Sequence, residues 1–515
     1  MSATGHENPI WKQVGKQFAA NVLSLGKNWR DKPLTLFRLG PVFLLLVLAI
    51  RLVTLGLYPL VDPTESRYAE MARKMLETGV WVTPQIGYGI PFWGKPPLAV
   101  WLNAFSLGIF GINEFAARLS ALLLCVGTVW LVGRAAVRHG REQDFTAVAI
   151  LAGMVLFFIM AGSVAMDQCL TLGVTLSMVS FWLALHKGKP YYGYLFFIGL
   201  SIGLLSKGPV ALVLVGLPLG LWTLVRNEWN AVWRGLPWVK GTLLMLAVSV
   251  PWYLLAEHRT PGFLEYFIVG EHWKRFTEKG WQGDLYGSGR AHAPGSIWLY
   301  WLFAALPWSP VFLAVLGTAI WRRNVSHLLD CPDGWRLYCL LWMLAPLMFF
   351  TLAANAIWTY VMPGLPGCAL LLAEWRRDGS LGWFANDRIA FAIGILSPAL
   401  FLVAVMAWQV APFKFVRTQK ALVVQYLELR KGSEDKLVYL WENPYSAQFY
   451  TRGKVGELSN VEEFQAAMDN PKQNFFACPR RSWADLPEAI KRRLQPVGAH
   501  NGYLLLYRFS RPEGQ

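Results

Sequence analysis

The chain of 515 residues is poor in charge. Only 16% of its residues are charged, whereas 55% are hydrophobic. A soluble domain would carry about 25% charged residues, so the composition excludes an ordinary soluble protein. The chain instead has apolar runs of roughly 20 residues, about the length that crosses the hydrocarbon core of a bilayer. The composition therefore predicts an all-α protein that crosses a membrane several times.

Cysteine and several familiar motifs are also scarce or missing. The six cysteines are scattered, no C-x-x-C occurs, and most of them fall in or beside apolar runs, so neither a disulfide framework nor a zinc site is indicated. The G-x-x-x-x-G-K-[ST] sequence is absent, which argues against nucleotide hydrolysis. No soluble nucleotide-sugar domain and no internal repeat of the transporter kind stand out.

Basic residues outnumber acidic ones, and the net charge is +16. In a soluble protein this excess would suggest a nucleic-acid partner. Here it lies in short loops at alternate ends of the apolar runs, so it reports membrane topology, because basic loops stay in the cytoplasm. We expect no nucleic-acid partner.

The basic loops predict three regions. Residues 1–38 form a cytoplasmic segment, in which 10–29 is compatible with an amphipathic helix on the inner leaflet. Residues 39–410 form a transmembrane domain of about eleven spans, from an uncleaved anchor at 41–61 to a last span near 388–410. Its far-side loops are 61–113, with a short interfacial helix over 97–111, and 257–296.

The third region, 411–515, differs in character and predicts a small α/β domain on the far side. The segments 436–441, 474–479 and 502–509 have the composition of strands. The segments 461–469 and 484–495 have the pattern of amphipathic helices.

Unusual polar residues collect at those ends of the predicted spans that face the far side. They are Asp62, Glu65, Arg67, Lys95, Asp167, Lys207, Glu271, His272, Arg275 and Tyr360. An ionisable residue at the centre of a membrane helix costs about 2.5–3.5 kcal/mol, so these residues must meet water or one another. Individually each has an ordinary explanation, such as a solvated flank, a snorkelling lysine or an aromatic belt. Their shared side of the membrane instead predicts one polar cavity at the outer surface.

Such a cavity suits one kind of chemistry. A carboxylate can take a proton from an acceptor, and Lys and Arg can hold the charge of a leaving phosphate. A substrate that is both phosphorylated and amphipathic would enter from the bilayer. A sugar carried on a polyprenyl phosphate fits this description.

Several motifs occur together and in a characteristic order: DPTESRYAEMARKMLETGVWVTP (62–84), FWGKPPL (92–98), LSKGP (205–209), GEHWKRF (270–276) and TYVMPGLPGCALLL (359–372). From about residue 55 to 375 the chain resembles the bacterial polyprenyl-phosphate-sugar transferases of the GT-C class, which include the lipid A aminoarabinose transferases and relatives of protein O-mannosyltransferase. The resemblance implies a multi-pass enzyme of the bacterial inner membrane. Its active site would face the periplasm, and membrane lipids would be among its partners.

The resemblance also implies roles for residues. Asp62 would be the base that activates the acceptor, with Glu65 in support and Asp167 at the second acidic position. Arg67, Lys95, Lys207 and Tyr360 would bind the donor phosphate, with Glu271, His272 and Arg275 as additional candidates. Aminoarabinose transferases read PDE-x-RYAE, whereas this chain has Thr64 in place of that Asp and carries its acid two residues earlier.

Some relatives bind a divalent metal through a Glu of an FEKP motif and the histidine of an EH motif. Here the Glu position is Gly94, which argues against a metal site that includes His272. A divalent metal stays an alternative, and no other cofactor is expected. The implied reaction is a single inverting displacement from a polyprenyl-phosphate-linked sugar to a lipid, glycan or protein acceptor. The alternatives are a transporter or flippase of lipid-linked sugars and an envelope scaffold.

Overall fold

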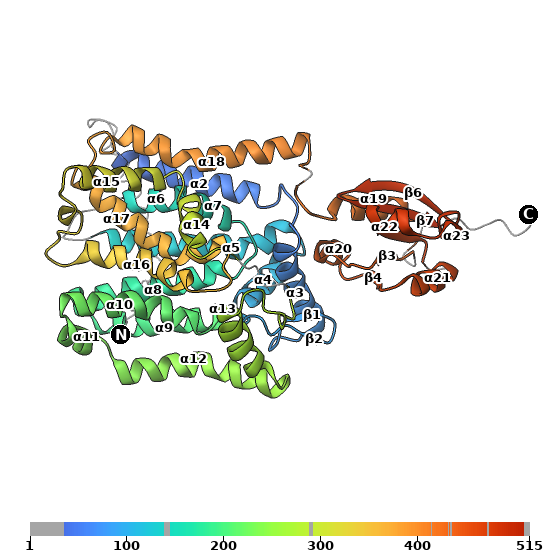
Figure 1. The fold of residues 1–515 in the computed structure, drawn as a ribbon, viewed down its shortest axis with the longest axis horizontal. Coiled ribbons are helices and arrows are strands. Elements are labelled where there is room, and N and C mark those ends of the chain that lie inside the picture. The colour runs from blue at the N-terminus through green and yellow to red at the C-terminus, as the bar shows by residue number, and fades with distance from the viewer. Residues whose placement is uncertain are drawn as a thin grey trace, which may run out of the picture.

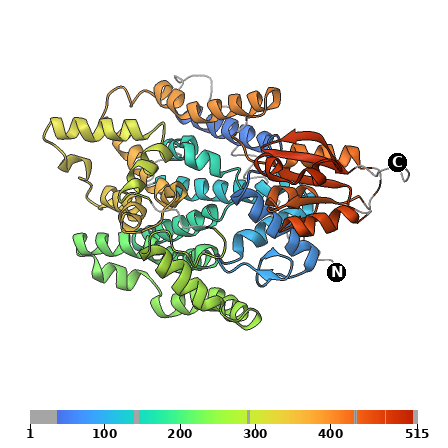
Figure 2. The ribbon, with the colours of Figure 1, turned by 45° about the vertical axis from the view of Figure 1, so that its right-hand side comes forward.

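The computed structural model describes residues 36–137, 145–287, 292–413, 415–430, 432, 435–470 and 473–508. These residues form a body of packed helices with a smaller α/β domain at one end of it (Figures 1 and 2). The amphipathic helix predicted within 10–29 lies outside them. The all-α membrane architecture with a small C-terminal α/β domain that the sequence predicts is therefore confirmed.

Four helices of the described residues are long and apolar enough to span a bilayer: α5 (Glu114–Ala136), α8 (Asp167–Lys187), α12 (Trp238–Arg259) and α18 (Asp387–Val410). The other helices of the body are shorter or less apolar: α2 (Leu36–Thr54), α6 (Thr146–Gly153), α7 (Val155–Met160), α9 (Pro190–Lys207), α10 (Val210–Arg226), α11 (Trp229–Gly235), α14 (Ser296–Ala304), α15 (Ser309–Trp321), α16 (Trp335–Thr351) and α17 (Leu365–Arg377). The figure of about eleven spans stays a prediction, because length and composition alone support four or five.

Two apolar segments of the body are broken. Helices α6 and α7 are separated at Met154, where the backbone is extended. Helices α14 and α15 meet at 111°. Pro307 lies at that bend, and proline cannot continue a helix because it lacks the N–H donor.

Glycines allow α8 and α9 to pack closely. A Cβ atom on Gly173 would lie 2.7 Å from the carbonyl oxygen of Gly199, and one on Gly199 would lie 2.4 Å from the Ser177 hydroxyl. Small residues at such contacts let helix backbones approach each other within a membrane. The two helices are joined by a short turn, so the first residue of α8, Asp167, lies beside the last residue of α9, Lys207.

Between the helical body and the C-terminal domain lies a layer formed by the far-side loop 61–113 (Figure 1). It contains α3 (Thr64–Thr78), a small hairpin of β1 (Gln85–Gly87) and β2 (Ile90–Pro91), and α4 (Leu98–Phe110). The helix α4 is the short helix expected over 97–111. Both α3 and α5 pack against it.

The C-terminal domain is built on a five-stranded sheet of order β4-β3-β5-β7-β6. Its elements are α19 (Lys420–Leu429), β3 (Leu437–Leu440), α20 (Tyr445–Tyr450), β4 (Val455–Leu458), α21 (Val461–Asp469), β5 (Phe475–Pro479), α22 (Arg480–Asp485), α23 (Glu488–Lys491), β6 (Leu494–His500) and β7 (Tyr503–Arg508). Strand β3 is parallel to β4 and β5, and β7 is antiparallel to β5 and β6. Apolar clusters cover both faces of the sheet.

The sequence predicted three of these strands but not β4 or β6. The single helix expected over 484–495 was wrong in its extent. Pro487 separates α22 from α23, and the chain then enters β6 at Leu494. Strand β6 is an edge strand with an irregular register at Pro496, a position where proline is tolerated because an edge strand need not donate every hydrogen bond.

Polar contacts hold the C-terminal domain against the layer beneath it. The Tyr450 hydroxyl accepts a hydrogen bond from the backbone N–H of Leu60 at 2.8 Å and donates to Glu114 at 3.0 Å. The Lys420 ammonium pairs with the same Glu114 carboxylate at 2.6 Å. These contacts place α20 directly over the start of α3.

Candidate active site

One pocket, of about 240 Å³, lies where the ends of α8 and α9 meet the far-side loops. It is lined by residues from distant parts of the chain: Lys95, Leu170, Lys207, Pro209, Val210, Val213, Glu271, His272, Arg275, Phe276, Phe349, Phe350, Asn355 and Tyr360. Six residues that the sequence selects as site candidates are among them. We call this the cation pocket, because it combines three cationic side chains with an apolar wall.

Lys207 occupies one side of the cation pocket. Its Nζ atom lies 2.7 Å from Asp167 Oδ1 and 4.7 Å from the centre of the Tyr360 ring. The pair is aligned with the helix dipoles, since Asp167 begins α8 and Lys207 ends α9. Asp167 accepts a hydrogen bond from one of the three N–H groups of the Lys207 ammonium. This contact holds Lys207 in place and does not use all three of its N–H groups.

A chain of alternating charges forms the other side of the pocket. The Lys95 ammonium lies 2.9 Å from Glu271, whose carboxylate also meets the Arg275 guanidinium at 3.0 Å. Arg275 in turn lies 3.4 Å from Asp284. Burial alone would raise the pKa of Glu271, but Lys95 and Arg275 outweigh burial and lower it. The carboxylate is therefore ionised at neutral pH and fixes both cations.

The backbone at this point is a π-helix, η1 (Glu265–Lys274), which continues into the single turn α13 (Arg275–Thr277). Such i→i+5 segments are rare and are frequently found at functional sites. Here the wider turn carries Glu271 and His272, and Arg275 follows directly after it. Tyr360 comes from another irregular segment, the 3₁₀ helix η3 (Trp358–Gly364).

The residues around His272 do not fit a metal site. Its Nδ1 atom lies 2.7 Å from the Phe267 carbonyl oxygen, and its Nε2 atom lies 3.0 Å from that of Lys207. Both ring nitrogens therefore face backbone oxygens. A carboxylate at Gly94 would also need room, because a Cβ atom there would approach the Phe92 ring at 2.9 Å. In the described part of the chain, no three His, Cys, Asp or Glu side chains are grouped to hold a metal ion.

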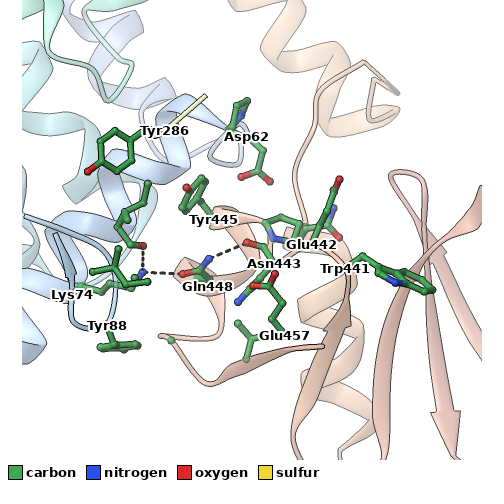
Figure 3. Close-up of a pocket in the computed structure, with 18 of the residues that line it drawn as sticks. Asp62, Lys74, Tyr88, Tyr286, Trp441, Glu442, Asn443, Tyr445, Gln448 and Glu457 are labelled. Carbon is green, nitrogen blue, oxygen red and sulfur yellow. Dashed lines mark hydrogen bonds between the residues drawn. The ribbon is translucent and has the colours of Figure 1, made fainter. Parts of the chain in front are cut away.

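A second pocket, of about 1170 Å³, lies between the far-side layer and the C-terminal domain (Figure 3). We call it the interdomain cleft. Asp62, Lys74, Tyr88 and Tyr286 line one side, and residues 441–445, Gln448 and Glu457 of the C-terminal domain line the other. Figure 3 shows Tyr445 beside Asp62, with Glu442 and Asn443 on the side of the C-terminal domain and Tyr286 on the opposite side.

The Asp62 carboxylate is held by two serines. Its Oδ1 atom accepts hydrogen bonds from the Ser446 backbone N–H at 2.9 Å and from the Ser66 hydroxyl, and its Oδ2 atom accepts one from the Ser446 hydroxyl. Burial raises the pKa of Asp62, and the hydrogen bonds from Ser446 and Ser66 limit that rise. An ionised carboxylate has about four acceptor positions, so Oδ2 can still take a proton from a ligand.

Glu65 lies only three residues away but has a different environment. Both of its carboxylate oxygens contact the Arg118 guanidinium, at 2.8 and 2.9 Å. Oε2 also accepts from the Val61 backbone N–H. Arg118 is fully buried and donates further to the carbonyl oxygens of Leu55, Tyr58 and Pro59. In this structure Glu65 ties the chain that leaves α2 to α5, and it faces neither pocket.

The two pockets are adjacent. Trp93 lines the interdomain cleft, and Lys95, two residues later, lines the cation pocket. Arg67 lies at the boundary, where its Nη1 atom donates to the Tyr286 carbonyl oxygen at 2.7 Å and its guanidinium lies 5.3 Å from the Tyr68 ring centre. The loop that carries Trp93 and Lys95 therefore borders both pockets.

A buried network fixes the wall of the cleft. Arg73 lies 2.7 Å from Glu70 and 2.6 Å from Glu77, and it donates to the Tyr88 hydroxyl at 2.9 Å. The next residue, Lys74, donates to the Ile86 carbonyl oxygen at 2.7 Å and to Gln448 of α20 at 2.9 Å. The charges of the RYAEMARKML stretch thus join α3 to the hairpin and to the C-terminal domain.

The structure thus sorts the candidate residues into groups. Lys95, Lys207, Glu271, Arg275 and Tyr360 line the cation pocket together with His272, and Asp167 reaches it through Lys207. Asp62 lines the cleft, Arg67 lies between the two, and Glu65 is in neither.

Sequence reasoning missed four residues that shape the site. Arg118 carried a signal, because it is an arginine inside an apolar run. Tyr286 lies in the second far-side loop, 257–296, and belongs to no motif. Tyr445 and Ser446 lie in the C-terminal domain, and no pattern there points to a residue near Asp62.

The comparisons with known proteins follow this geometry. Residues 34–267 match the family model of dolichyl-phosphate-mannose-protein mannosyltransferases. Over 366 residues the chain is 30% identical to the undecaprenyl phosphate-alpha-4-amino-4-deoxy-L-arabinose arabinosyl transferase of Yersinia enterocolitica, a match that covers 67% of this chain and 62% of that protein. Over 400 residues it is 30% identical to the protein of the same name from Enterobacter sp., a match that covers 74% of this chain and 68% of that protein.

The chain belongs to this arabinosyl transferase family. The resemblance that the motifs carry is thereby confirmed. The match spans about three fifths of the length of the Yersinia relative. The fold is that of ArnT from Cupriavidus metallidurans bound to undecaprenyl phosphate, with a TM-score of 0.72 and 19% identity over 91% of this chain and 98% of that chain. Together with its apolar helices, the family assigns the chain to the multi-pass membrane proteins.

Proposed function

We propose that the protein is a glycosyltransferase that moves a sugar from a polyprenyl phosphate to an acceptor in the cell envelope. The observation that carries the proposal is the pairing of the two pockets. One combines three cations with an apolar wall, and the other holds a partly buried carboxylate that can still accept a proton. Membership of the arabinosyl transferase family supports the same reading.

The cation pocket suits the phosphate end of the donor. Lys95, Lys207 and Arg275 supply N–H donors, and Phe276 and Phe349 supply an apolar wall for the first part of a lipid chain. Because carboxylates already hold these cations, the site is arranged before the donor arrives. Charge that develops on the leaving phosphate then meets donors that need not reorganise, which is where an active site gains most over water.

We propose Asp62 as the general base, acting from the interdomain cleft. The acceptor oxygen attacks the anomeric carbon of the sugar and its proton passes to Asp62 Oδ2. The new bond between carbon and acceptor oxygen forms while the bond between that carbon and the phosphate oxygen breaks. The electron pair leaves with the polyprenyl phosphate, beside Lys95 and Lys207. Such a direct displacement inverts the configuration at the anomeric carbon.

We further propose that this reaction takes place at the periplasmic face of the bacterial inner membrane. The proposal is supported by the distribution of basic residues, which leaves Arg134, Arg226, Arg322 and Arg377 on the opposite side from the two pockets. A lipid-linked donor would then reach the cation pocket from the outer leaflet.

The experiment that tests the proposal is a transfer assay with the full chain reconstituted in lipid nanodiscs. Undecaprenyl phosphate-linked aminoarabinose serves as donor and an extract of envelope lipids and glycans as acceptor, with products identified by mass spectrometry. We expect Asp62→Asn and Lys207→Ala each to lower the transfer rate at least about a hundredfold, the usual scale for losing a base or a charge-stabilising group. The matched control Lys240→Ala, at the start of α12 and exposed, should retain wild-type activity.

Two results would contradict the proposal. Near-normal transfer by the Asp62→Asn variant would remove the assigned base. Movement of the labelled donor between leaflets of a vesicle without any glycosidic product would instead favour the lipid-linked sugar flippase.

A further inference from the structure

Glu65 takes no part in the proposed reaction, yet its carboxylate is completely bonded within the protein. Its Oε1 atom accepts hydrogen bonds from Arg118 Nε at 2.8 Å and from the Val164 backbone N–H at 3.3 Å. Its Oε2 atom accepts from Arg118 Nη2 at 2.9 Å and from the Val61 backbone N–H at 3.0 Å. An ionised carboxylate has about four acceptor positions, so none is left for a proton or a ligand. Glu65 therefore acts on the chain around it.

The two backbone groups that donate to this carboxylate lie close in sequence to Asp62 and Asp167. Val61 is the residue before Asp62, and Val164 comes three residues before Asp167. Asp167 in turn holds the Lys207 ammonium at 2.7 Å. One carboxylate thus joins the segment that carries the proposed base to the segment that holds a cation of the leaving-group site.

The turn that contains Val164 is held from several sides. Helix α7 has only six residues, and the carbonyl groups at the end of a helix have no partners within that helix. The Tyr58 hydroxyl donates to the Gly162 carbonyl oxygen at 2.7 Å. The Gln168 side chain donates to two more carbonyl oxygens between the helices α7 and α8, at 2.6 and 2.7 Å. Glu65 completes this set, because it accepts the hydrogen bond from the N–H of the same turn.

Packing makes the turn respond as a unit. Val164 and Met166 are buried in one apolar cluster with residues of α3 such as Ala69 and Met71. Close-packed interiors transmit a displacement instead of absorbing it. A shift at Val164 should therefore move Asp167, which follows Met166 directly and begins α8.

A displacement reaction needs such a tie. The attacking oxygen and the leaving phosphate lie on opposite sides of the anomeric carbon, so the base and the cation must keep a fixed separation. A misplacement of about 1 Å can lower a rate about a hundredfold. Asp62 is held by two serines and Lys207 by Asp167, so the link between the two halves has to come from another group.

We propose that Glu65 is a positioning residue that fixes the separation between Asp62 and the pair of Asp167 and Lys207. The inference rests on the proposed function, because this separation matters only if both groups act in one reaction. Glu65 itself touches no substrate and takes no proton. Its carboxylate sets the spacing through the backbone N–H group that it holds on either side.

Amide hydrogen exchange of the full chain in nanodiscs tests the tie without any reaction. Glu65→Gln should raise exchange at least about tenfold in residues 58–66 and 160–168 together, because the hydrogen bonds to a charged group are lost. Glu65→Asp keeps a negative charge beside Arg118 but withdraws the carboxylate by one methylene. It should raise exchange in 160–168, where Val164 loses its acceptor, and it keeps the test independent of whether Glu65→Gln folds. The control Arg336→Gln breaks an ion pair with Asp378 outside both segments and should leave their exchange unchanged.

The transfer assay then tests whether the tie serves catalysis. Glu65→Asp should lower kcat/KM about ten- to a hundredfold in the otherwise wild-type protein. The same change should cost no more than about threefold when Lys207 is already replaced by alanine, because a positioning residue has little to lose once the group that it positions is gone. Arg336→Gln, which acts only on stability, should change kcat/KM by the same factor in both backgrounds.

The outcomes separate this inference from the proposed function. Transfer by the wild type together with equal losses from Glu65→Asp in both backgrounds would overturn the inference and leave the transferase intact. Unchanged exchange of 160–168 in the Glu65 variants would overturn it as well. A wild-type protein that transfers no sugar would instead overturn the proposed function, and the exchange data would still report on the tie.

Discussion

Replacing Ser446 by alanine should change the pH dependence of catalysis. The substitution removes the hydroxyl that donates to Asp62 Oδ2 and leaves the Ser446 backbone N–H on Oδ1. The hydroxyl stabilises the charged form of the carboxylate. Its loss therefore raises the pKa of Asp62 further than burial already does. A base with a raised pKa is protonated, and so inactive, over a wider range of acidic pH.

The size of the effect follows from the hydrogen bond that is lost. A hydrogen bond to a charged group contributes about 1.5–3 kcal/mol, and about 1.4 kcal/mol corresponds to one pH unit. The acid limb of the pH profile of kcat/KM should therefore move upward by about one to two pH units. At alkaline pH, where the carboxylate is ionised in both proteins, the rates should approach each other.

The assay is the reconstituted transfer reaction measured across the pH range. Ser446→Thr keeps the hydroxyl and should restore the wild-type profile, and Ser459→Ala, an exposed serine of the same domain, is the control. A Ser446→Ala variant that loses activity equally at every pH would refute the reasoning, because Ser446 would then act only through packing.

Three further predictions concern the framework around the site. Arg118→Ala should destabilise the protein by about 3–5 kcal/mol, because it leaves the Glu65 carboxylate buried without its cation. Thermal unfolding in detergent measures this loss, and an unchanged unfolding temperature would contradict the role of Arg118 in anchoring Glu65. Gly453→Ala should loosen the C-terminal domain, since the residue has a φ of +76° and a new Cβ atom would lie 2.4 Å from the Tyr88 hydroxyl; faster proteolysis between α18 and α19 would report it, and wild-type resistance would refute it. The hydrogen bond from Tyr88 lowers the pKa of Glu77. This contact therefore stabilises the fold above the unfolded-state pKa of Glu77, and the stabilisation is lost as the pH falls through the lowered value. Amide hydrogen exchange of residues 85–91 should rise on acidification in the wild type but not in Glu77→Gln.

The sequence predicted much of the cation pocket because its residues stand out from their surroundings. Lys207 follows an apolar run, and Glu271 and Arg275 lie in a charged motif between spans. Ionisable groups are expensive in a membrane, so each one needs a partner, and their common side of the membrane was enough to group them.

The division into two pockets could not be predicted. Asp62 and Glu65 are three residues apart and chemically alike, yet one lies on the cleft and the other binds Arg118. Which of them a buried arginine would reach depends on how α5 packs against the chain that leaves α2, and local sequence does not encode that packing. The second wall of the cleft comes from a domain whose residues carry no motif.

The contacts of Asp62 have a consequence for the order of synthesis. Ser446 follows Asp62 by 384 positions, and a ribosome releases the N-terminal part of a chain first. The spans would already be in the bilayer, and the cation pocket formed, while the serine that steadies the base is still untranslated. A newly made molecule would therefore lack both the serine contacts of Asp62 and one wall of the interdomain cleft until its last domain has folded over α3.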